Sequence, residues 1–394
     1  MRAGLIFALP LLPVYIALGG CGNDSNNNNG SDSAPAATVT VANLNILHGF
    51  DCDPPTPADG DQCRVRDRVA LLGQHLIADG CPDLVTLQEI VNKEYVQRSP
   101  TEQAGPLDSL VTLITAELPN LARSCGFTYE LVYQPFLPAA VAETDEELIL
   151  SRYPVVQTDT RALHSAMYDE THGFLIFARH LLHARIEHPT GTVDLYTTHL
   201  SSGSDSATNN CTSFRELVAG TGIGPQVACP PECDSQDTVR ACQARQLALY
   251  VEQTRGAHNL GIISGDFNAV PGSSEYQEMT GRGWLDSHTA TGQPACDGTT
   301  GIGCTTGRDA GVGDLEQSAL NVDARIDYIF VVPPDNQTCV ASLASGQQGR
   351  YAIIDAGLFA GAPNPFAKTC GAPPEPICWV SDHSGNRASL RCQP

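Results

Sequence analysis

Residues Gly261–Gly272 read GIISGDFNAVPG. The apolar start of this stretch predicts a buried strand, and the strand ends in two polar side chains, Asp266 and Asn268. An unpaired polar group beside an apolar core is costly, so both side chains need hydrogen-bond partners or a ligand. Gly265 and Pro271 also predict a turn here. The stretch is therefore either a turn alone or a turn that carries half of an active site.

Similar apolar runs recur along the chain between turn-rich loops. Besides 261–270, the runs predicted as strands are 38–47, 83–90, 147–156, 174–187, 192–200 and 324–332. Apolar residues three and four apart predict helices from Val65 to Leu76 and from Leu107 to Leu118, and a third helix is expected over about 238–255. Several strands with few helices between them predict an α/β (α+β) fold built as a layered sandwich.

Composition excludes some classes of protein. The chain has 394 residues, of which 42% are apolar, so it can bury a core and is not disordered over most of its length. Its formal charge is −22. This balance argues against a sequence-independent DNA coat, because such binding depends on Lys and Arg that neutralise phosphates. It leaves room for an enzyme whose site is made positive by a metal and a few arginines.

The N-terminus reads MRAGLIFALPLLPVYIALGGC and predicts a signal peptide over residues 1–20, since the apolar stretch is short and broken by prolines. Its end, LGGC, resembles the lipobox of bacterial lipoproteins, which implies lipidation of Cys21. Residues 21–37 are a polar, low-complexity tether. The folded domain, with disulfide-rich loop insertions, is expected over 38–394. These features predict an exported protein, anchored by lipid to the bacterial cell envelope or secreted; the alternative is an ordinary secretory signal with a chance cysteine.

The cysteines point to an oxidising compartment. There are fifteen, so fourteen remain when Cys21 is set aside, and an exported chain with that many thiols is expected to form disulfides. Cys52 with Cys63 and Cys296 with Cys304 are candidate local pairs. A cluster of four further cysteines can form disulfides or hold zinc, and its irregular spacing favours disulfides; its members are Cys211, Cys229, Cys233 and Cys242.

Polar residues of catalytic type stand at or near the C-terminal ends of six apolar runs. They are Asn45, Glu89, His199, Asp266 with Asn268, Asp327, and Asp382 with His383. Each has a structural explanation by itself: Asn45 can cap a turn, Glu89 can cap a helix, and His199 can be a buried histidine with satisfied hydrogen bonds. Together they indicate a site, because strand ends gathered at one edge of a sandwich bring Glu89, Asp266 and Asp382 close to one another.

Three carboxylates that meet in this way need a cation. A set of oxygen ligands suits Mg²⁺, Mn²⁺ or Ca²⁺ better than zinc. Asp327 beside His383 would orient an imidazole for proton transfer. Arg152, Arg179 and Arg325 are candidates for holding a phosphate, with rim charges as the structural alternative.

The ordered motifs NILHG, LQE, LSRYP, THL, GDFNAVP, RIDYIF and SDH resemble the endonuclease/exonuclease/phosphatase superfamily over roughly residues 38–394. The resemblance implies a four-layer α/β sandwich with two mainly antiparallel sheets flanked by helices. It also implies Mg²⁺-dependent hydrolysis of a phosphoester. By motif, Glu89 resembles the principal metal ligand, Asn45 lies beside the metal or phosphate, and Asp382 resembles a ligand of a second metal.

The same resemblance implies the remaining roles. Asp266 would orient or deprotonate the attacking water, and Asn268 would position water and phosphate. Asp327 would pair with His383, which holds the scissile phosphate or transfers a proton. His199 would stabilise the phosphate or assist the leaving group.

The expected function is an exported phosphodiesterase, a nuclease first and a phospholipid or sphingomyelin phosphodiesterase, or a phosphatase, second. The expected substrate is thus nucleic acid or a phospholipid headgroup, and the chain is expected to be a monomer. Leu47 stands where apurinic endonucleases often have an acid, which argues against DNA repair. A catalytically inactive surface lipoprotein that uses the scaffold for binding is the non-enzymatic alternative.

Overall fold

A computed structural model describes the chain over ten segments: residues 38–47, 64–91, 109–135, 145–164, 179–202, 230–308, 314–319, 322–335, 337 and 350–393. The chain divides into two compact units, Met1–Pro35 and Ala36–Pro394, and every described residue belongs to the second. The expected signal peptide, the tether and Cys21 lie outside the described residues and stay predictions.

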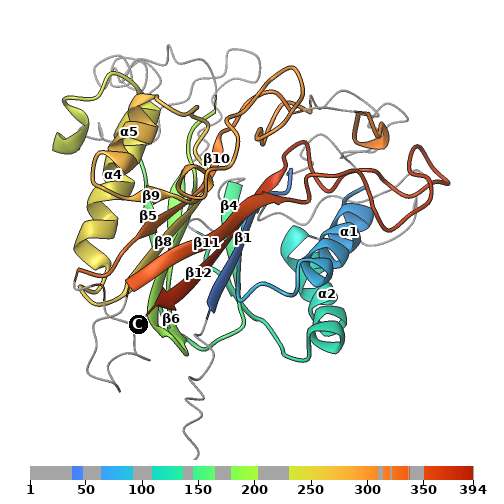
Figure 1. The fold of residues 1–394 in the computed structure, drawn as a ribbon, viewed down its shortest axis with the longest axis horizontal. Helices are drawn as coiled ribbons and strands as arrows, with labels where there is room; N and C mark the ends of the chain where they lie inside the picture. The colour runs from blue at the N-terminus through green and yellow to red at the C-terminus, as the bar shows by residue number, and fades with distance from the viewer. Residues whose placement is uncertain are drawn as a thin grey trace, which may run out of the picture. The chain divides into compact units, whose positions relative to one another are not determined.

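Two six-stranded sheets form the centre of this unit (Figure 1). In the first sheet the order is β11 (Arg350–Phe359), β12 (Gly385–Gln393), β1 (Thr38–Asn45), β2 (Leu84–Val91), β4 (Asp145–Ser151) and β3 (Glu130–Tyr133). In the second sheet the order is β5 (Val155–Ala162), β6 (His180–His188), β7 (Gly191–His199), β8 (Leu260–Asp266), β10 (Asp327–Val332) and β9 (Leu285–Asp286). Each sheet has one parallel pair near its middle, β1 with β2 and β7 with β8, and its other pairs are antiparallel.

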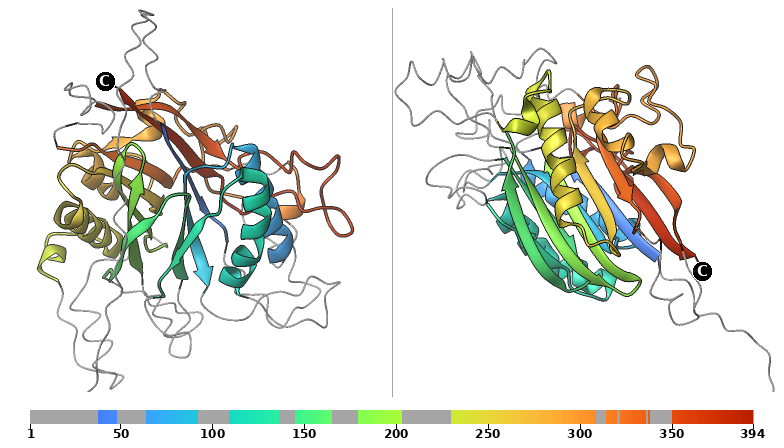
Figure 2. Two further views of the ribbon diagram at one scale, coloured as in Figure 1. Left: turned by 90° about the horizontal axis from the view of Figure 1, so that it is seen from below. Right: turned by 90° about the vertical axis from the view of Figure 1, so that its left-hand side faces the viewer.

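Helices cover the outer faces of both sheets, as Figures 1 and 2 show. On the first sheet lie α1 (Val65–Ala78) and α2 (Leu110–Cys125), and on the second lie α4 (Val239–Thr254) and α5 (Ser274–Thr280). The short elements are η3 (Pro231–Cys233), α6 (Ser287–Ala290) and η4 (Asp314–Glu316). The four-layer sandwich predicted from the sequence is confirmed.

The long helices begin where side chains satisfy their first amides. Ser109 accepts a hydrogen bond from Thr112 N at the start of α2, and Thr238 accepts one from Ala241 N at the start of α4. At its other end α2 stops at Gly126, whose φ of +77° is a left-handed conformation that glycine adopts at little cost.

The space between the sheets is apolar over most of its extent and polar near one edge. Its apolar part includes Val39, Leu84 and Ile262, all of which are fully buried. Toward the ends of β2 and β7, Gln88 Nε2 donates to Thr197 Oγ1 across the sheets at 2.9 Å. Hydrogen bonds therefore replace apolar contacts between the layers at the edge where the strands end.

The expected strand over 147–156 is wrong as one element. It divides at residues 152–154 into β4 and β5, which belong to different sheets. Pro154 lacks a backbone N–H, and Tyr153 N bonds back to Ser151 Oγ at 3.1 Å, so the chain turns here. The sequence does not predict β11, because its half-exposed residues lack a continuous apolar run.

Four disulfides form among the described residues: Cys81–Cys125, Cys233–Cys242, Cys296–Cys304 and Cys370–Cys378. The predicted pair Cys296–Cys304 is confirmed, and a disulfide, not zinc, joins Cys233 to Cys242. Cys52, Cys63, Cys211 and Cys229 lie outside the described residues. Among the helices that the structure describes, none has both the length and the apolar composition needed to cross a bilayer.

Candidate active site

Polar side chains from both sheets meet at the edge where the parallel pairs end. Asn45 closes β1 and His199 closes β7, while Asp266 closes β8 and lies opposite His199 in the ladder. Asp327 also lies opposite Asp266, because β10 runs antiparallel to β8. The sequence prediction that all these residues follow their strands is wrong for two places: Asp327 opens β10, and the loop that carries His383 precedes β12.

Asn45 joins the two sheets at this edge. Its Nδ2 donates to Glu89 Oε1 at 2.8 Å in the first sheet and to Asp266 Oδ2 at 3.0 Å in the second. Glu89 has a φ of +62°, and the register of β2 against β4 shifts between Leu87 and Ile90. A bulge of this kind redirects a side chain, and left-handed backbone at a non-glycine residue is costly enough to be typical of functional sites.

The Asp-x-Asn turn at the end of β8 is real, and it builds part of the site. Asn268 N donates to Asp266 Oδ1 at 2.8 Å, which closes an Asx turn with a φ of +49° at Asn268. The Asn268 amide then donates to Leu200 O at 2.9 Å and lies 2.9 Å from His199 Nε2. His199 Nε2 is also 3.4 Å from Asp266 Oδ2. The turn therefore places an amide, a carboxylate and an imidazole together.

Gly265 is required for this arrangement. Its φ is +151°, and a Cβ at this position would lie 2.0 Å from the backbone oxygen of Thr198 in β7. Strands β7 and β8 can pair closely beside the site only because residue 265 has no side chain.

His383 and Asp327 form the second half of the cluster. His383 Nδ1 is 2.9 Å from Asp327 Oδ2, and its Nε2 is 3.2 Å from Thr306 Oγ1 and 3.8 Å from Asp266 Oδ2. Burial alone would lower the pKa of His383, but the charges of Asp327 and Asp382 outweigh it and hold that pKa well above its usual value. His383 is therefore an imidazolium at neutral pH.

Burial, with a further contribution from Asp266, raises the pKa of Asp327 to about 6, so it is an anion beside that imidazolium at neutral pH. Its Oδ1 is buried and makes no hydrogen bond to any described residue. Burial and then the charge of Glu89 raise the pKa of Asp382, which accepts a hydrogen bond from Ser381 Oγ at 3.0 Å. Solvent reaches Glu89, Asn268 and Asp382, which are the partly exposed members of the cluster.

The charges and donor atoms fit a divalent cation. Four carboxylates, Glu89, Asp266, Asp327 and Asp382, lie at this edge against one imidazolium, and Asp327 Oδ1 is a buried acceptor without a donor. Asp266, Asp327 and His383 offer ligand atoms that all lie within 4.8 Å of one another. The third member is His383, whose imidazole cannot ligate a metal while it is protonated; the sequence predicted oxygen ligands alone.

Two arginines that sequence reasoning missed fasten the loop that carries Asp382 and His383. Arg308 donates to His383 O at 2.7 Å and to Ser381 O at 3.2 Å, and its guanidinium lies 3.8 Å from the centre of the Trp379 ring. Arg68 of α1 donates to Val380 O at 3.3 Å in that loop, and to Leu47 O at 3.0 Å. Arg68 interrupts the apolar pattern of α1, a signal that was visible in the sequence; Arg308 lies in an irregular loop that gave none.

The three arginines predicted to bind phosphate lie in different surroundings. Arg152 pairs with Asp83 at 3.3 Å before the start of β2, at the opposite end of the strand from Glu89. Arg325 forms a buried ion pair with Asp286 at 2.7 Å, so its charge is already neutralised. Arg179 directly precedes β6, whose start lies beside the end of β7, so the register brings it to the site edge.

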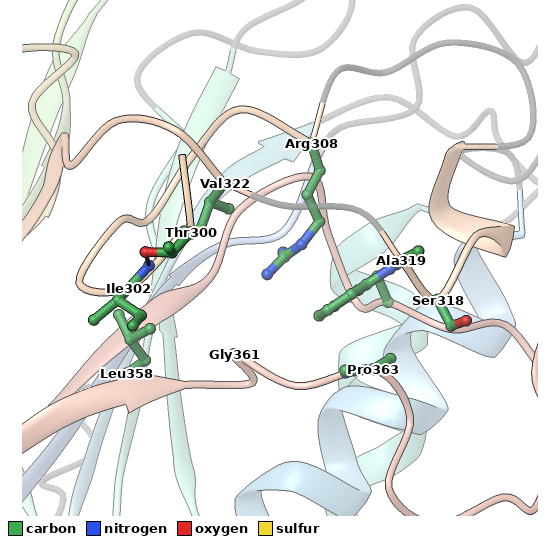
Figure 3. Close-up of a pocket in the computed structure, with 11 residues that line it drawn as sticks. Thr300, Ile302, Arg308, Ser318, Ala319, Val322, Leu358, Gly361 and Pro363 are labelled. Atoms are coloured by element: carbon green, nitrogen blue, oxygen red, sulfur yellow. Dashed lines mark hydrogen bonds between the residues drawn. The ribbon is translucent and has the colours of Figure 1, made fainter. Parts of the chain in front are cut away.

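A cavity of about 350 Å³ lies beside the loop of Asp382 and His383 (Figure 3). Its walls include Arg308 and Trp379 together with the apolar side chains of Ile302, Leu358 and Pro363. Because Arg308 also holds His383 O, the cavity shares a wall with the site.

A known protein family and several solved structures are similar to this chain. The model of the Endonuclease/Exonuclease/phosphatase family matches residues 42–383. A search of curated proteins finds no significant match. Among solved structures, the endonuclease/exonuclease/phosphatase from Bacteroides vulgatus is 16% identical, with 91% of this chain and 100% of that chain covered and a TM-score of 0.52. A protein of the same description from Bacteroides thetaiotaomicron is 13% identical, with 91% and 99% covered and a TM-score of 0.51. At these identities the structures show a shared fold.

Proposed function

The chain belongs to the endonuclease/exonuclease/phosphatase family and is a hydrolase of that family, and on this premise we propose that it is a metal-dependent phosphodiesterase that cleaves nucleic acid outside the cytoplasm. The observation that carries the proposal is the convergence of Asn45, Glu89, His199, Asp266, Asn268, Asp327 and His383 on facing edges of two sheets.

Each side of the cluster has a role in attack on phosphorus. Asp266 has one oxygen held by Asn268 N and the other by Asn45 Nδ2, so its carboxylate is fixed in position to orient a water molecule. The Asn268 amide and His199 lie together and would contact phosphoryl oxygens. His383 is held protonated by Asp327 and supplies positive charge or a proton to the phosphate or the leaving oxygen.

Asn45, Glu89 and Asp382 are the residues we propose to hold Mg²⁺, with Mn²⁺ or Ca²⁺ as substitutes. Bound there, the cation would neutralise charge on the phosphate and stabilise the leaving oxygen. Asn45 and Glu89 share a hydrogen bond, and the repulsion between Glu89 and Asp382 would be relieved by a cation. Oxygen donors of this kind suit these hard cations.

A phospholipid or sphingomyelin phosphodiesterase is the second candidate. The cavity walled by Trp379, Ile302 and Leu358 supports it, because apolar walls beside a phosphoester site accept an organic group. The net charge of −22 also disfavours a long polyanion relative to a small headgroup.

Purified full-length protein distinguishes these activities. It is incubated with DNA, RNA and sphingomyelin vesicles, each with Mg²⁺, Mn²⁺, Ca²⁺ or EDTA. Metal-dependent release of acid-soluble nucleotides supports the nuclease, and phosphocholine release without nucleotide release supports the lipid enzyme. Absence of both with every cation contradicts the proposal and favours an inactive binding protein.

We also propose that the protein is exported and attached to the cell envelope through a lipid on Cys21. The four disulfides among the described residues support an oxidising compartment. Labelling of expressing cells with a radioactive fatty acid tests the anchor: wild type should incorporate label and Cys21→Ala should not. Label in both proteins would contradict lipidation at this thiol.

A further inference from the structure

A cluster of buried charged side chains lies between the two sheets and outside the site described above. It consists of Glu146 and Glu147 in β4 and His180 at the start of β6. His180 Nε2 lies 2.8 Å from Glu146 Oε2 and 2.6 Å from Glu147 Oε2, and no side chain of the three is more than 1% exposed. We call these residues the interlayer cluster.

The interlayer cluster connects the first sheet to the backbone of His199 in the second. Glu147 Oε1 accepts a hydrogen bond from His199 N at 2.9 Å. In the ladder Leu181 lies opposite Thr198, so His180 and His199 are neighbours at the same edge of the second sheet. One carboxylate of β4 therefore contacts both β6 and β7, close to the proposed phosphate-binding imidazole.

The distances fit direct ion pairs rather than ligands around a bound cation. Ligand atoms around a tetrahedral ion with bonds of about 2.0–2.1 Å lie about 3.3 Å apart, whereas these N–O separations are 2.6 and 2.8 Å. Burial opposes a charge on His180, but Glu147 and Glu146 outweigh it and raise its pKa to about 10. The two carboxylates thus stabilise the charge of His180 between the sheets.

Displacement of His199 would disturb more than one contact of the site. The Asn268 amide lies 2.9 Å from His199 Nε2 and donates to Leu200 O, the carbonyl of the next residue. Both contacts depend on where the end of β7 lies, and Glu147 holds that end through the amide of His199.

We propose that Glu147 is a positioning residue for His199, and that His180, which lies between Glu147 and Glu146, holds Glu147 in place. This inference rests on the proposed function, since it assigns His199 a contact with the phosphate. It assigns no contact between substrate and the interlayer cluster.

The chain offers a matched control. Asp194 and His183 form another buried carboxylate–histidine pair, 3.0 Å apart, on the same β6–β7 hairpin. Asp194 lies opposite Arg185 near the other end of β7, so it makes no contact with His199. Glu147→Ala removes the acceptor for His199 N, Glu147→Gln keeps an acceptor oxygen without the charge, and Asp194→Asn changes an equally buried carboxylate elsewhere.

The test measures kcat and KM for a small phosphodiester, bis(p-nitrophenyl) phosphate, with Mg²⁺, and measures hydrogen exchange of the His199 amide. We expect Glu147→Ala to lower kcat about 100-fold with KM changed less than about threefold, since misplacement of a reacting group by about 1 Å costs this much. Glu147→Gln should recover about tenfold of the loss. The His199 amide should exchange at least tenfold faster in Glu147→Ala, and Asp194→Asn should leave kcat and this exchange rate unchanged.

Unchanged kcat or unchanged His199 exchange in both Glu147 variants would overturn the inference, and so would an equal loss of kcat in Asp194→Asn. If Glu147→Ala does not fold, Glu147→Gln carries the same comparison. One equivalent of tightly bound zinc or manganese that is lost in His180→Asn but retained in Asp266→Asn would overturn it in favour of a metal site. If wild type hydrolyses nothing, the proposed function fails, while amide exchange at His199 still tests whether Glu147 holds it.

Discussion

Replacing Asp327 by Asn tests the pair that we assign to proton transfer. The carboxylate oxygen lies 2.9 Å from His383 Nδ1, and neither side chain is more than 7% exposed. The substitution keeps the shape of the side chain but removes the charge that stabilises the imidazolium. General acid–base catalysis contributes about 10²–10⁴-fold, so we expect kcat to fall by about that factor, which corresponds to roughly 3–5 kcal/mol.

The pKa of His383 determines the direction in which the pH dependence of activity should shift. The pKa of His383 is raised, with burial opposing and Asp327 as the leading favourable charge. A step that needs the imidazolium proceeds below that pKa and fails above it. Removing Asp327 lowers the pKa, so the alkaline limb of the kcat/KM profile should move to lower pH.

The assay follows hydrolysis of bis(p-nitrophenyl) phosphate from pH 5 to 10 by wild type, Asp327→Asn and the buried control Asp194→Asn. Folding of each protein is checked by thermal unfolding. The reasoning is refuted if Asp327→Asn keeps activity within threefold of wild type, or if its alkaline limb does not move. It is also refuted if Asp194→Asn loses as much activity.

Three further predictions concern stability. Burial opposes ionisation of Asp194, but its hydrogen bonds lower its pKa from 3.8 to about 2. This shift contributes about 2 kcal/mol to the free energy of unfolding, which is present above pH 4 and lost as the pH falls through 2. In urea unfolding, wild type should therefore lose this stability between pH 7 and pH 2, and Asp194→Asn should show no such difference. Gly265→Ala should lower the free energy of unfolding in urea by at least about 3 kcal/mol, because the added Cβ meets the backbone of β7. Gly292→Ala, whose added Cβ has no atom within 4 Å, should lower it by about 1 kcal/mol. Equal losses would contradict the close approach of β7 and β8 at Gly265. Asp286→Ala should cost about 3–5 kcal/mol because it leaves Arg325 buried and unpaired, and a variant as stable as wild type would return Arg325 to the candidates for phosphate binding.

The sequence predicted those features that depend on local pattern. The apolar run that ends in Asp266 is β8, and spacing of three and four residues marked α1 and the body of α2. The Asx turn at Asn268 followed from its residue types. Motif order predicted which residues come to the site edge, although not the direction in which each strand reaches it.

Contacts between distant parts of the chain could not be predicted, because no local pattern marks them. Arg325 pairs with Asp286, 39 residues away, and Glu147 accepts a hydrogen bond from His199 N, 52 residues away. Neither pair has a local spacing rule. The strand β12 was missed because polar residues such as Arg387 and Arg391 interrupt its apolar side chains, and its place in the sheet comes from pairing with β1.

We propose that this edge of the sandwich hydrolyses phosphodiesters with the help of a divalent cation. The most direct measurement is the initial rate of DNA and RNA cleavage by EDTA-treated protein as Mg²⁺ is added back, with Asp266→Asn measured in parallel. We predict no cleavage in EDTA, a saturable return of activity with Mg²⁺ in wild type, and a loss of at least about 100-fold in Asp266→Asn. Cleavage that is undiminished in EDTA, or equal in the two proteins, would contradict the account.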